Sequence, residues 1–474
     1  MKIEDKLSLL FKKWNGNSPD SIKPLPVSGS ARKYFRLKYN NISVVGVFGP
    51  EQKENHAFIS FSKHFKSIGL NVPEIYDEEL SSNIYLEEDL GDHTLFNLLK
   101  SDFNHAKDFY KKAVEDLILF QVDGRKKIDY AVCYPRESFD RQSMKWDLNY
   151  FKYYFLKPLN IFYNEQKLED DFNTLINFLL EADNSYFLYR DFQSRNILIK
   201  DKKLYYVDYQ GGRKGALQYD LASLLFDAKA DLSIYFRNEI LEHYIESITK
   251  KIRINEKEFR RYFYGFCLIR ILQAMGAYGF RGIYEGKTHF LQSIPYALKN
   301  LKWLLEDSKI VIKLPELEYL LSQIINSTEL QKFGEIQPAG KLKVTINSFS
   351  YRDKIPNDYS GNGGGFVFDC RGIENPGRQD KFKELTGLDK PVQEFLENET
   401  SVKDFLNNTN EIINRSIKNY SERKFTNLQI NFGCTGGQHR SVYCAQKTAE
   451  QLSANKDIII DLHHIALEKK EHEL

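Results

Sequence analysis

The chain reads Tyr189-Arg190-Asp191-Phe192-Gln193-Ser194-Arg195-Asn196, followed at once by the apolar run Ile197-Leu198-Ile199 and soon after by Tyr205-Tyr206-Val207-Asp208. The apolar runs have the residue types of short strands, so we expect a hairpin that returns Asp208 to the preceding loop. Asp191, Asn196 and Asp208 should then lie close together. A carboxylate can orient an attacking hydroxyl, while an amide oxygen and a second carboxylate can hold Mg²⁺ across phosphates. The order of these residues is typical of phosphoryl transfer.

A plainer interpretation makes Asp191 a turn residue and Asp208 a surface carboxylate at a strand end. It accounts for either residue alone. It does not explain why an acid, an amide and a second acid recur in order between apolar runs.

Length and composition exclude several classes of protein. The 474 residues suffice for roughly two to four folding units. A hydrophobic fraction of 42% with 14% aromatic residues excludes a wholly disordered chain, and a net charge of +2 is too small for a protein that coats nucleic acid. Five widely spaced cysteines indicate reduced thiols and a cytoplasmic location. We find neither a signal peptide at the start nor a membrane span.

The pattern of hydrophobic and polar residues divides the chain into four parts. Residues 1–90 are strand-rich with one helical segment, and residues 91–326 are mainly helical. Residues 327–342 are polar with Gly and Pro, which predicts a linker. In residues 343–474 strand-like runs alternate with helical stretches, which predicts a separate α/β domain.

A second polar constellation lies between Leu428 and Val442, where a strand, a Gly-rich turn and a helix start follow one another. Gly436 and Gly437 let the backbone approach an anion closely, and N–H groups at a helix start point at it. Arg440 adds a guanidinium group that can donate two parallel hydrogen bonds, and Ser441 adds a hydroxyl. These features predict a phosphate-binding loop. The alternative is a tight turn that needs Gly for steric reasons only.

Residues 20–320 resemble the aminoglycoside phosphotransferase/choline kinase superfamily, closest to the branch that phosphorylates N-acetylmuramate and N-acetylglucosamine at the anomeric hydroxyl. Besides the segment quoted first, the matching stretches are residues 28–37, 86–92 and 219–225. The resemblance implies a bilobal protein-kinase-like fold, with an N-lobe over residues 1–90 and a helical C-lobe over residues 91–326. It also implies roles for individual residues: Asp191 as catalytic base, Asn196 and Asp208 as Mg²⁺ ligands, and Gly29, Ser30 and Arg32 over the phosphates.

Two departures from this family matter. Tyr189 stands where many relatives have His, at a position that supports the loop. The strand at residues 43–47 lacks the Lys that usually clamps the phosphates, and Arg32 or Lys53 could supply that charge. A kinase-like domain without activity is therefore an alternative.

Sugar contacts are expected from the helical lobe. Trp146 and Tyr209 could stack on a sugar face, and Asp147 could accept a sugar hydroxyl; helix packing is an equal alternative for Trp146. Arg195, inside the catalytic loop, is expected to steady the transferring phosphoryl group or else to pair with Asp220.

Residues 343–470 resemble the C-terminal domain of the RapZ family, whose loop reads G-C-T-G-G-x-H-R-S-V; residues 347–352, 366–371 and 385–392 match in the same order. In that family the module binds a hexosamine phosphate and, in some members, regulatory RNA. The resemblance implies ligand contacts from Asp369, Arg371, Cys434, Thr435, Gly436, Gly437, His439, Arg440 and Ser441. Basic residues do not outnumber acidic ones here, which disfavours RNA. Cys434 and Arg440 also have the C-x₅-R spacing of cysteine phosphatases.

The sequence therefore predicts an α/β and α+β multidomain protein: a sugar kinase that uses ATP or GTP with Mg²⁺, fused to a phosphosugar-binding regulatory module. Amino sugars of cell-wall recycling are the expected acceptors, by the resemblance. Two alternatives stay open. One is a non-catalytic sensor or adaptor, and the other is a bifunctional kinase with a Cys-dependent phosphatase.

Overall fold

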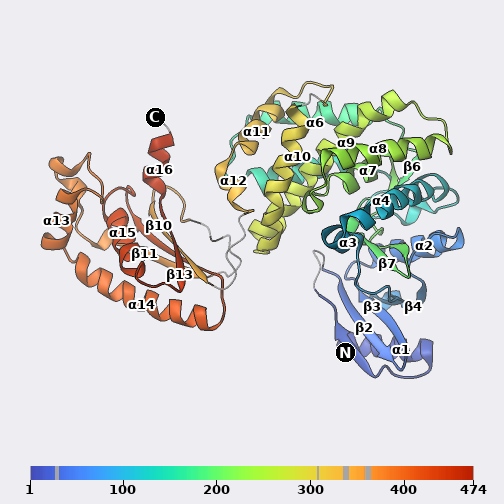
Figure 1. Ribbon diagram of the computed structural model, residues 1–474, viewed down its shortest axis with the longest axis horizontal. Helices are drawn as coiled ribbons and strands as arrows, with labels where there is room; N and C mark the ends of the chain where they lie inside the picture. The colour runs from blue at the N-terminus through green and yellow to red at the C-terminus, as the bar shows by residue number, and fades with distance from the viewer. Residues whose placement is uncertain are drawn as a thin grey trace. The chain divides into compact units, whose positions relative to one another are not determined.

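The computed structural model describes residues 2–26, 31–306, 309–334, 341–356, 358 and 364–472. The chain divides into two compact units (Figure 1). Unit 1 comprises Met1–Tyr284 and Phe290–Gly334, and unit 2 comprises Glu285–His289 and Glu335–Leu474. Among the helices described, none combines the length and apolar character needed to cross a bilayer.

Unit 1 begins with an antiparallel sheet of five strands in the order β1-β2-β3-β5-β4. One face is covered by α1, which packs Leu7, Leu10 and Phe11 onto the sheet. Gly16, in the left-handed conformation with φ 84°, ends that helix. The elements of this N-lobe are α1 (Ile3–Asn15), β1 (Ser21–Pro24), β2 (Lys33–Tyr39), β3 (Ile42–Phe48), α2 (Gln52–Ser67), β4 (Ile75–Glu79) and β5 (Ile84–Glu88).

The second lobe of unit 1 is helical and is built around α9, which packs against α5, α7 and α10. Its helices are α3 (Leu95–Ser101), α4 (Phe103–Ile118), α5 (Arg141–Phe151), α6 (Glu165–Leu179), α7 (Gln218–Leu225), α8 (Ile234–Thr249), α9 (Glu256–Tyr278), α10 (Ile294–Glu306), α11 (Pro315–Ile325) and α12 (Thr328–Lys332). The last of these lies inside the expected linker. Leu330 is buried where α12 packs on α10, so this stretch is part of unit 1 and not an extended connection.

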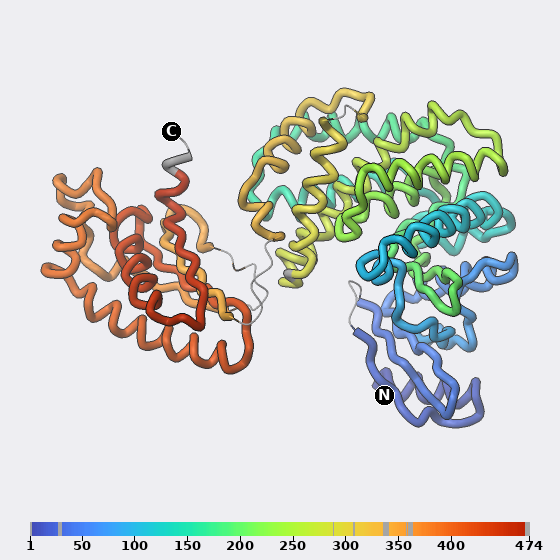
Figure 2. Tube along the Cα trace, in the orientation of Figure 1, coloured from blue at the N-terminus to red at the C-terminus, as the bar shows by residue number. Residues whose placement is uncertain are grey.

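Two short antiparallel strand pairs flank the loops that carry Asp191, Asn196 and Asp208. Strand β6 (Tyr186–Leu188) pairs with β9 (Arg213–Gly215), and β7 (Ile197–Lys200) pairs with β8 (Lys203–Tyr206). The β7–β8 pair is the hairpin expected from the sequence. Asp201 and Lys202 turn it with positive φ, as a two-residue hairpin requires. In Figure 2 the green trace of this hairpin lies beside α3, and the Ile199 N–H donates to the His93 carbonyl at 2.8 Å.

Unit 2 has a four-stranded, all-parallel sheet in the order β11-β12-β10-β13. The strands are β10 (Leu342–Ser350), β11 (Gly365–Asp369), β12 (Asn427–Cys434) and β13 (Ile458–His464); the helices are α13 (Lys390–Glu399), α14 (Val402–Glu422), α15 (Arg440–Leu452) and α16 (Ile465–His472). Helix α15 packs across β10, β12 and β13. Because the strands are parallel, the carboxyl ends of β10 and β12 lie side by side at one edge of the sheet, where ligands bind in such sheets.

The fold class expected from the sequence is confirmed. A sheet-containing lobe precedes a helical lobe in a protein-kinase-like unit, and a separate α/β domain follows. Hydrophobic periodicity indicated the strand-rich, helical and α/β parts of the chain, and the family resemblance implied the bilobal kinase-like arrangement.

The core of unit 2 generates a test of its stability. Ile346 lies in the central strand β10 and is fully buried, whereas Ile412 on α14 is 48% exposed. We expect Ile346→Ala to lower the free energy of unfolding by about 2–5 kcal/mol, because it leaves a cavity in the sheet core. The matched control Ile412→Ala should change it little. Chemical unfolding of the full chain measures both, and equal effects would contradict this description of the core.

Candidate active site

The loop that follows β6 is held by a buried carboxylate on α7. Asp220 accepts the Tyr189 N–H on Oδ2 at 2.7 Å and the Arg190 N–H on Oδ1 at 2.9 Å. Burial raises the pKa of Asp220 to about 7, while the two backbone hydrogen bonds oppose that rise. Arg190 has φ 86°, a strained value for a residue with a side chain that costs about 1–3 kcal/mol. The two hydrogen bonds to Asp220 hold the backbone in this conformation.

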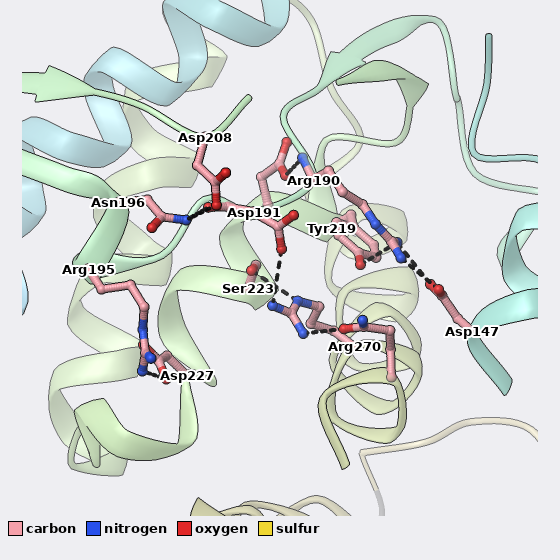
Figure 3. Close-up of polar contacts among 12 residues, drawn as sticks. Asp147, Arg190, Asp191, Arg195, Asn196, Asp208, Tyr219, Ser223, Asp227 and Arg270 are labelled. Atoms are coloured by element: carbon pink, nitrogen blue, oxygen red, sulfur yellow. Dashed lines mark hydrogen bonds and ion pairs between the residues drawn. The ribbon is translucent and has the colours of Figure 1, made fainter. Parts of the chain in front are cut away.

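The amide of Asn196 joins the two loops that the sequence predicts to meet. Its Nδ2 donates to the Asp191 carbonyl at 2.9 Å and to Asp208 Oδ2 at 3.1 Å (Figure 3). Gln210 donates to the other oxygen of Asp208 at 2.7 Å. Burial, and then the nearby charge of Asp191, raise the pKa of Asp208. The structure therefore brings Asp191, Asn196 and Asp208 together, with acidic charge concentrated between them.

Tyr189 stabilises this arrangement from within the protein. Its ring is fully buried, and its hydroxyl donates to the Val207 carbonyl at 2.5 Å. Val207 directly precedes Asp208, which has φ 71°. A long aromatic side chain thus connects the first loop to the second.

A cavity of about 580 Å³ lies between the two lobes of unit 1, within the size range of small-molecule sites. Asp191, Asn196 and Asp208 all line it. The N-lobe sheet and the segment after β5 also contribute. Other lining residues are Leu25, Arg32, Tyr34, Val45, Glu87, Asp89, Leu90, Gly91, Arg195, Leu198, Gln210 and Arg281.

Strand β3 shows why no lysine reaches this cavity. Val45 lines the cavity, so the alternation of the strand directs Gly46 to the opposite face. There a Cβ on Gly46 would lie 2.7 Å from Leu37 Cδ1, so a side chain would fit only if the packed leucines moved. Val47 shares the face of Val45 and is fully buried.

Arg32 provides positive charge at this end of the cavity. Its guanidinium is buried, donates to the Tyr85 hydroxyl at 3.0 Å and lies 3.7 Å from Glu54 of α2. Lys53, the other residue considered for this charge, lies over the Tyr134 ring and lines a different cavity. Gly29 and Ser30, expected over the phosphates, lie outside the described residues.

Two arginines lie close to the polar cluster, Arg195 in the same loop as Asp191 and Arg270 on α9. Arg195 lines the cavity and pairs with Asp227 at 3.4 Å, not with Asp220. Arg270 of α9 lies with Nη2 3.8 Å from Asp191 Oδ1, and its Nε donates to the Ser223 hydroxyl at 3.0 Å (Figure 3). Sequence reasoning missed Arg270, because nothing near it in the chain indicates that α9 passes behind the loop.

The structure corrects the expected sugar contacts. Both oxygens of Asp147 accept from Arg190, at 2.8 and 2.6 Å, so this carboxylate is part of a buried ion pair. Tyr209 is fully buried, with its hydroxyl 2.6 Å from that of Ser62. Trp146 is 44% exposed and lies near Arg136. None of these three side chains lines the cavity between the lobes.

In unit 2 the Gly-rich loop joins the end of β12 to the start of α15, as the sequence predicts. Gly437 has φ 65°, and a Cβ there would lie 3.0 Å from the Ser350 backbone nitrogen, so only Gly fits. The loop borders a cavity of about 170 Å³ at the carboxyl ends of the strands. Its lining residues are Arg352, Asn375, Gly377, Cys434, Thr435, Gly436, Gln438, His439 and Arg440.

Several residues expected at this anion site have structural contacts instead. Arg440 is buried, and its Nη1 donates to the carbonyls of Arg371 and Ile373 at 3.0 and 2.7 Å. Asp369 and Arg371 pair with each other at 2.7 Å, and neither lines the cavity. Ser441 is fully buried with its hydroxyl 3.1 Å from Cys434 Sγ.

The remaining expected ligands surround the cavity mouth. Thr435 and Gly436 are exposed, and His439 Nε2 lies 2.9 Å from the Phe382 carbonyl. Arg352, from the loop after β10, is an exposed cation on this cavity that sequence reasoning quoted without giving it a role. Parallel pairing of β10 with β12 brings it there.

Two family descriptions match separate parts of this chain. Residues 21–254 match the phosphotransferase enzyme family, and residues 342–468 match the RapZ C-terminal domain. Both catalytic-loop carboxylates fall within the first match, and the Gly-rich loop falls within the second.

Curated relatives carry the name nucleotide-binding protein. One from Mannheimia succiniciproducens is 32% identical over 170 residues, which are 36% of this chain and 55% of the relative. One from Haemophilus influenzae is 34% identical over 149 residues, which are 31% of this chain and 50% of the relative. The chain thus spans about half the length of the curated relatives it matches.

Similarity to solved structures is low in sequence and in geometry. A choline kinase from Cryptosporidium parvum is 13% identical with a TM-score of 0.46, covering 68% of this chain and 99% of that one. The aminoglycoside phosphotransferase APH(4)-Ia, as a thermostable mutant in its apo form, is 12% identical with a TM-score of 0.43, covering 64% and 99%.

The Tyr189 hydroxyl provides a test of how the second loop is positioned. Tyr189→Phe removes its hydrogen bond to the Val207 carbonyl, so the backbone at Asp208 is held less firmly. We expect the affinity for Mn²⁺, measured by electron paramagnetic resonance with a nucleoside diphosphate present, to fall about fivefold.

The matched control is Tyr206→Phe. Tyr206 is also a buried tyrosine, but its hydroxyl donates to Asp116 at 2.8 Å and does not contact the Asp208 loop. This variant should keep the wild-type affinity for Mn²⁺. An equal loss in both variants would contradict a specific role of Tyr189.

Proposed function

Because residues 21–254 of this chain belong to the phosphotransferase enzyme family and residues 342–468 form a RapZ C-terminal domain, we propose that the protein is a sugar kinase with a phosphosugar-binding module. It transfers the γ-phosphate of a nucleoside triphosphate to a sugar hydroxyl. The observation that carries the proposal is the gathering of Asp191, Asn196 and Asp208 on one cavity between two lobes. The acceptor we favour is an amino sugar of cell-wall recycling, such as N-acetylmuramate or N-acetylglucosamine, on the sequence resemblance. All five cysteines are unbridged, which supports a cytoplasmic location.

The two carboxylates differ in their hydrogen-bond partners, and this difference separates their roles. The Asp191 side chain is 44% exposed, so it can reach the hydroxyl of an acceptor in the cavity and take its proton. Asp208 is held by Asn196 and Gln210. Arg270 contacts Asp191 from behind and fixes the direction of its carboxylate.

The residues present fit Mg²⁺. Asn196 and Asp208 offer an amide and a carboxylate, and Mg²⁺ binds one or two carboxylates together with substrate phosphates. In the described part of the chain, no group of three or more His, Cys, Asp or Glu side chains is arranged for a metal, which agrees with a site completed by phosphate. Asn196 and Asp208 would hold the ion, which when bound neutralises charge on the phosphates.

Arg32 favours an active kinase over an inert sensor. A buried guanidinium beside Glu54 places a permanent positive charge on the same cavity as Asp208. An arginine can hold phosphate oxygens through two parallel hydrogen bonds. The absence of a lysine on β3 is therefore compensated from the loop before β2.

A screen of amino sugars by phosphorus nuclear magnetic resonance tests the activity and identifies the acceptor. Asp191→Asn should lower kcat by about 10²–10⁴-fold, because the proton of the acceptor hydroxyl loses its base. The matched control is Asp201→Asn in the exposed turn of the β7–β8 hairpin, which should retain wild-type activity. No phosphorylated sugar from the wild-type protein, or full activity in Asp191→Asn, would overturn the proposal.

For unit 2 we propose that the cavity beside the Gly-rich loop binds a hexosamine phosphate. A cavity of about 170 Å³ suits a phosphate with part of a small sugar, and Arg352 supplies exposed positive charge. A phosphatase is disfavoured, because Arg440 donates to backbone carbonyls and the Cys434 sulfur is buried. RNA binding is also disfavoured, since the module has no excess of basic residues.

Arg352 gives the test of this second site. In the full-length protein, Arg352→Gln should weaken binding of glucosamine 6-phosphate about tenfold by calorimetry, because the phosphate loses a charged donor. Arg423→Gln, an exposed arginine that lies over Phe425, is the matched control and should bind normally. If the module regulates the kinase, the ligand changes the kinase rate of the wild type but not of Arg352→Gln. Equal binding by both variants would contradict the assignment of this cavity.

A further inference from the structure

The carboxyl group of Glu87 lines the cavity of unit 1. In the sequence, Glu87 lies far from the loop that carries Asp191 and Asn196. Glu87 lies in β5, directly opposite Val45 of β3 in the register of the sheet. Residues opposite each other project to the same face, and both line the cavity. Glu87 is only 8% exposed. Two residues later, Asp89 begins the connection that leads to α3 and the helical lobe.

The surroundings of Glu87 suit a flat, largely apolar ring. Leu25 and Val45 from the N-lobe and Leu198 from β7 line the same cavity. Aliphatic side chains from both lobes can hold an aromatic ring between them, with a few polar groups at its edge that set its orientation. With the phosphates at Asp208 and Arg32, as in the proposed function, the base of the nucleotide is the part that occupies this space.

One carboxyl oxygen of Glu87 can still form a hydrogen bond with a ligand. Its Oε2 is buried and has no hydrogen-bond partner among the residues that the structure describes. Buried polar atoms are normally paired, so an unpaired one on a cavity wall indicates a ligand atom. In a carboxylic acid the O–H donates while the carbonyl oxygen accepts.

Charged and titratable groups around Glu87 decide its protonation. Burial raises the pKa of Glu87 to about 8, Arg32 opposes the rise and Asp89 adds to it. The hydroxyls that interact with it electrostatically are those of Tyr34 on β2, Tyr85 on its own strand and Tyr209 after β8. Because the pKa is above neutrality, the carboxyl carries its proton at pH 7 and loses it as the pH rises through about 8.

We propose that Glu87 reads the nucleobase: its O–H donates to N7 of adenine and its carbonyl oxygen accepts from the N6 amino group, so that ATP is selected over GTP. Adenine presents one acceptor and one donor on that edge, whereas guanine presents two acceptors, O6 and N7. A neutral carboxyl has one donor and one acceptor there, as the side-chain amides that pair with adenine do. The inference rests on the proposed function, because it requires a nucleotide in the cavity.

Two variants of the full-length protein test this residue. Glu87→Gln keeps one donor and one acceptor but cannot titrate in this range, and Glu87→Met keeps the length of the side chain without either. Binding of ADP and GDP is measured by calorimetry with Mg²⁺ and without acceptor sugar, at about pH 6.5 and about pH 9. Thermal unfolding shows whether each variant is folded.

At the lower pH, the wild type and Glu87→Gln should both prefer ADP over GDP by about tenfold, and Glu87→Met should lose the preference. At the higher pH the wild type should bind both nucleotides about tenfold more weakly, because the carboxylate no longer donates to N7 of either purine, while Glu87→Gln should keep its affinities. The Gln variant also reports any pH dependence that comes from other groups. Should Glu87→Met fail to fold, the comparison of wild type and Glu87→Gln across pH still decides.

The outcomes separate this inference from the proposed function. A wild-type protein that binds ADP and GDP equally, or whose affinity for ADP has the same pH dependence as that of Glu87→Gln, overturns the role of Glu87 alone. Retention of the preference by folded Glu87→Met does the same. A wild-type protein that binds neither nucleotide overturns the proposed kinase function and this inference together.

Discussion

The active-site geometry depends on the buried carboxylate of Asp220. Its two oxygens accept the backbone N–H groups of consecutive residues, Tyr189 and Arg190, and so fix the chain where it leaves β6. The strained φ of Arg190 is tolerated because the helix α7 that carries Asp220 is itself fully buried. Asp191, the next residue, is thereby directed into the cavity. Without an acceptor at this position the two N–H groups would be buried and unpaired, which proteins avoid.

The other contacts of the site depend on the two hydrogen bonds to Asp220. Asn196 reaches from the same loop to Asp208, and Tyr189 reaches to the carbonyl before Asp208. The hairpin of β7 and β8 brings the second loop back within range of these two side chains. A short connection of strands thus places two acids and an amide together, although burial and the charge of Asp191 raise the pKa of Asp208. Such concentration of acidic charge is stable when a cation or a donor group balances it.

Unit 2 also places polar groups around a cavity, but it does so at the edge of a parallel sheet. Its parallel sheet brings the carboxyl ends of β10 and β12 together at one edge, beside a small crevice. The Gly-rich loop fills one edge of that crevice, and Gly437 is required because the Ser350 backbone is too close for a side chain. Arg440 helps to build the crevice through backbone carbonyls and is not a freely accessible cation. In both units, the backbone conformation of a loop shapes the site, and charged side chains then line it.

The sequence by itself determined the strand-rich, helical and α/β parts of the chain and the polar residues of both loops, because hydrophobic periodicity and turn residues act locally. It also indicated that Asp191, Asn196 and Asp208 would meet, since a hairpin leaves few other possibilities. Only the tertiary structure decided which charged groups are available to a ligand. Asp147 pairs with Arg190, Arg195 with Asp227, and Asp369 with Arg371, while Arg270 reaches Asp191, and Glu87 the cavity, from distant elements. Such pairings depend on long-range packing and burial, which no local pattern of residues encodes.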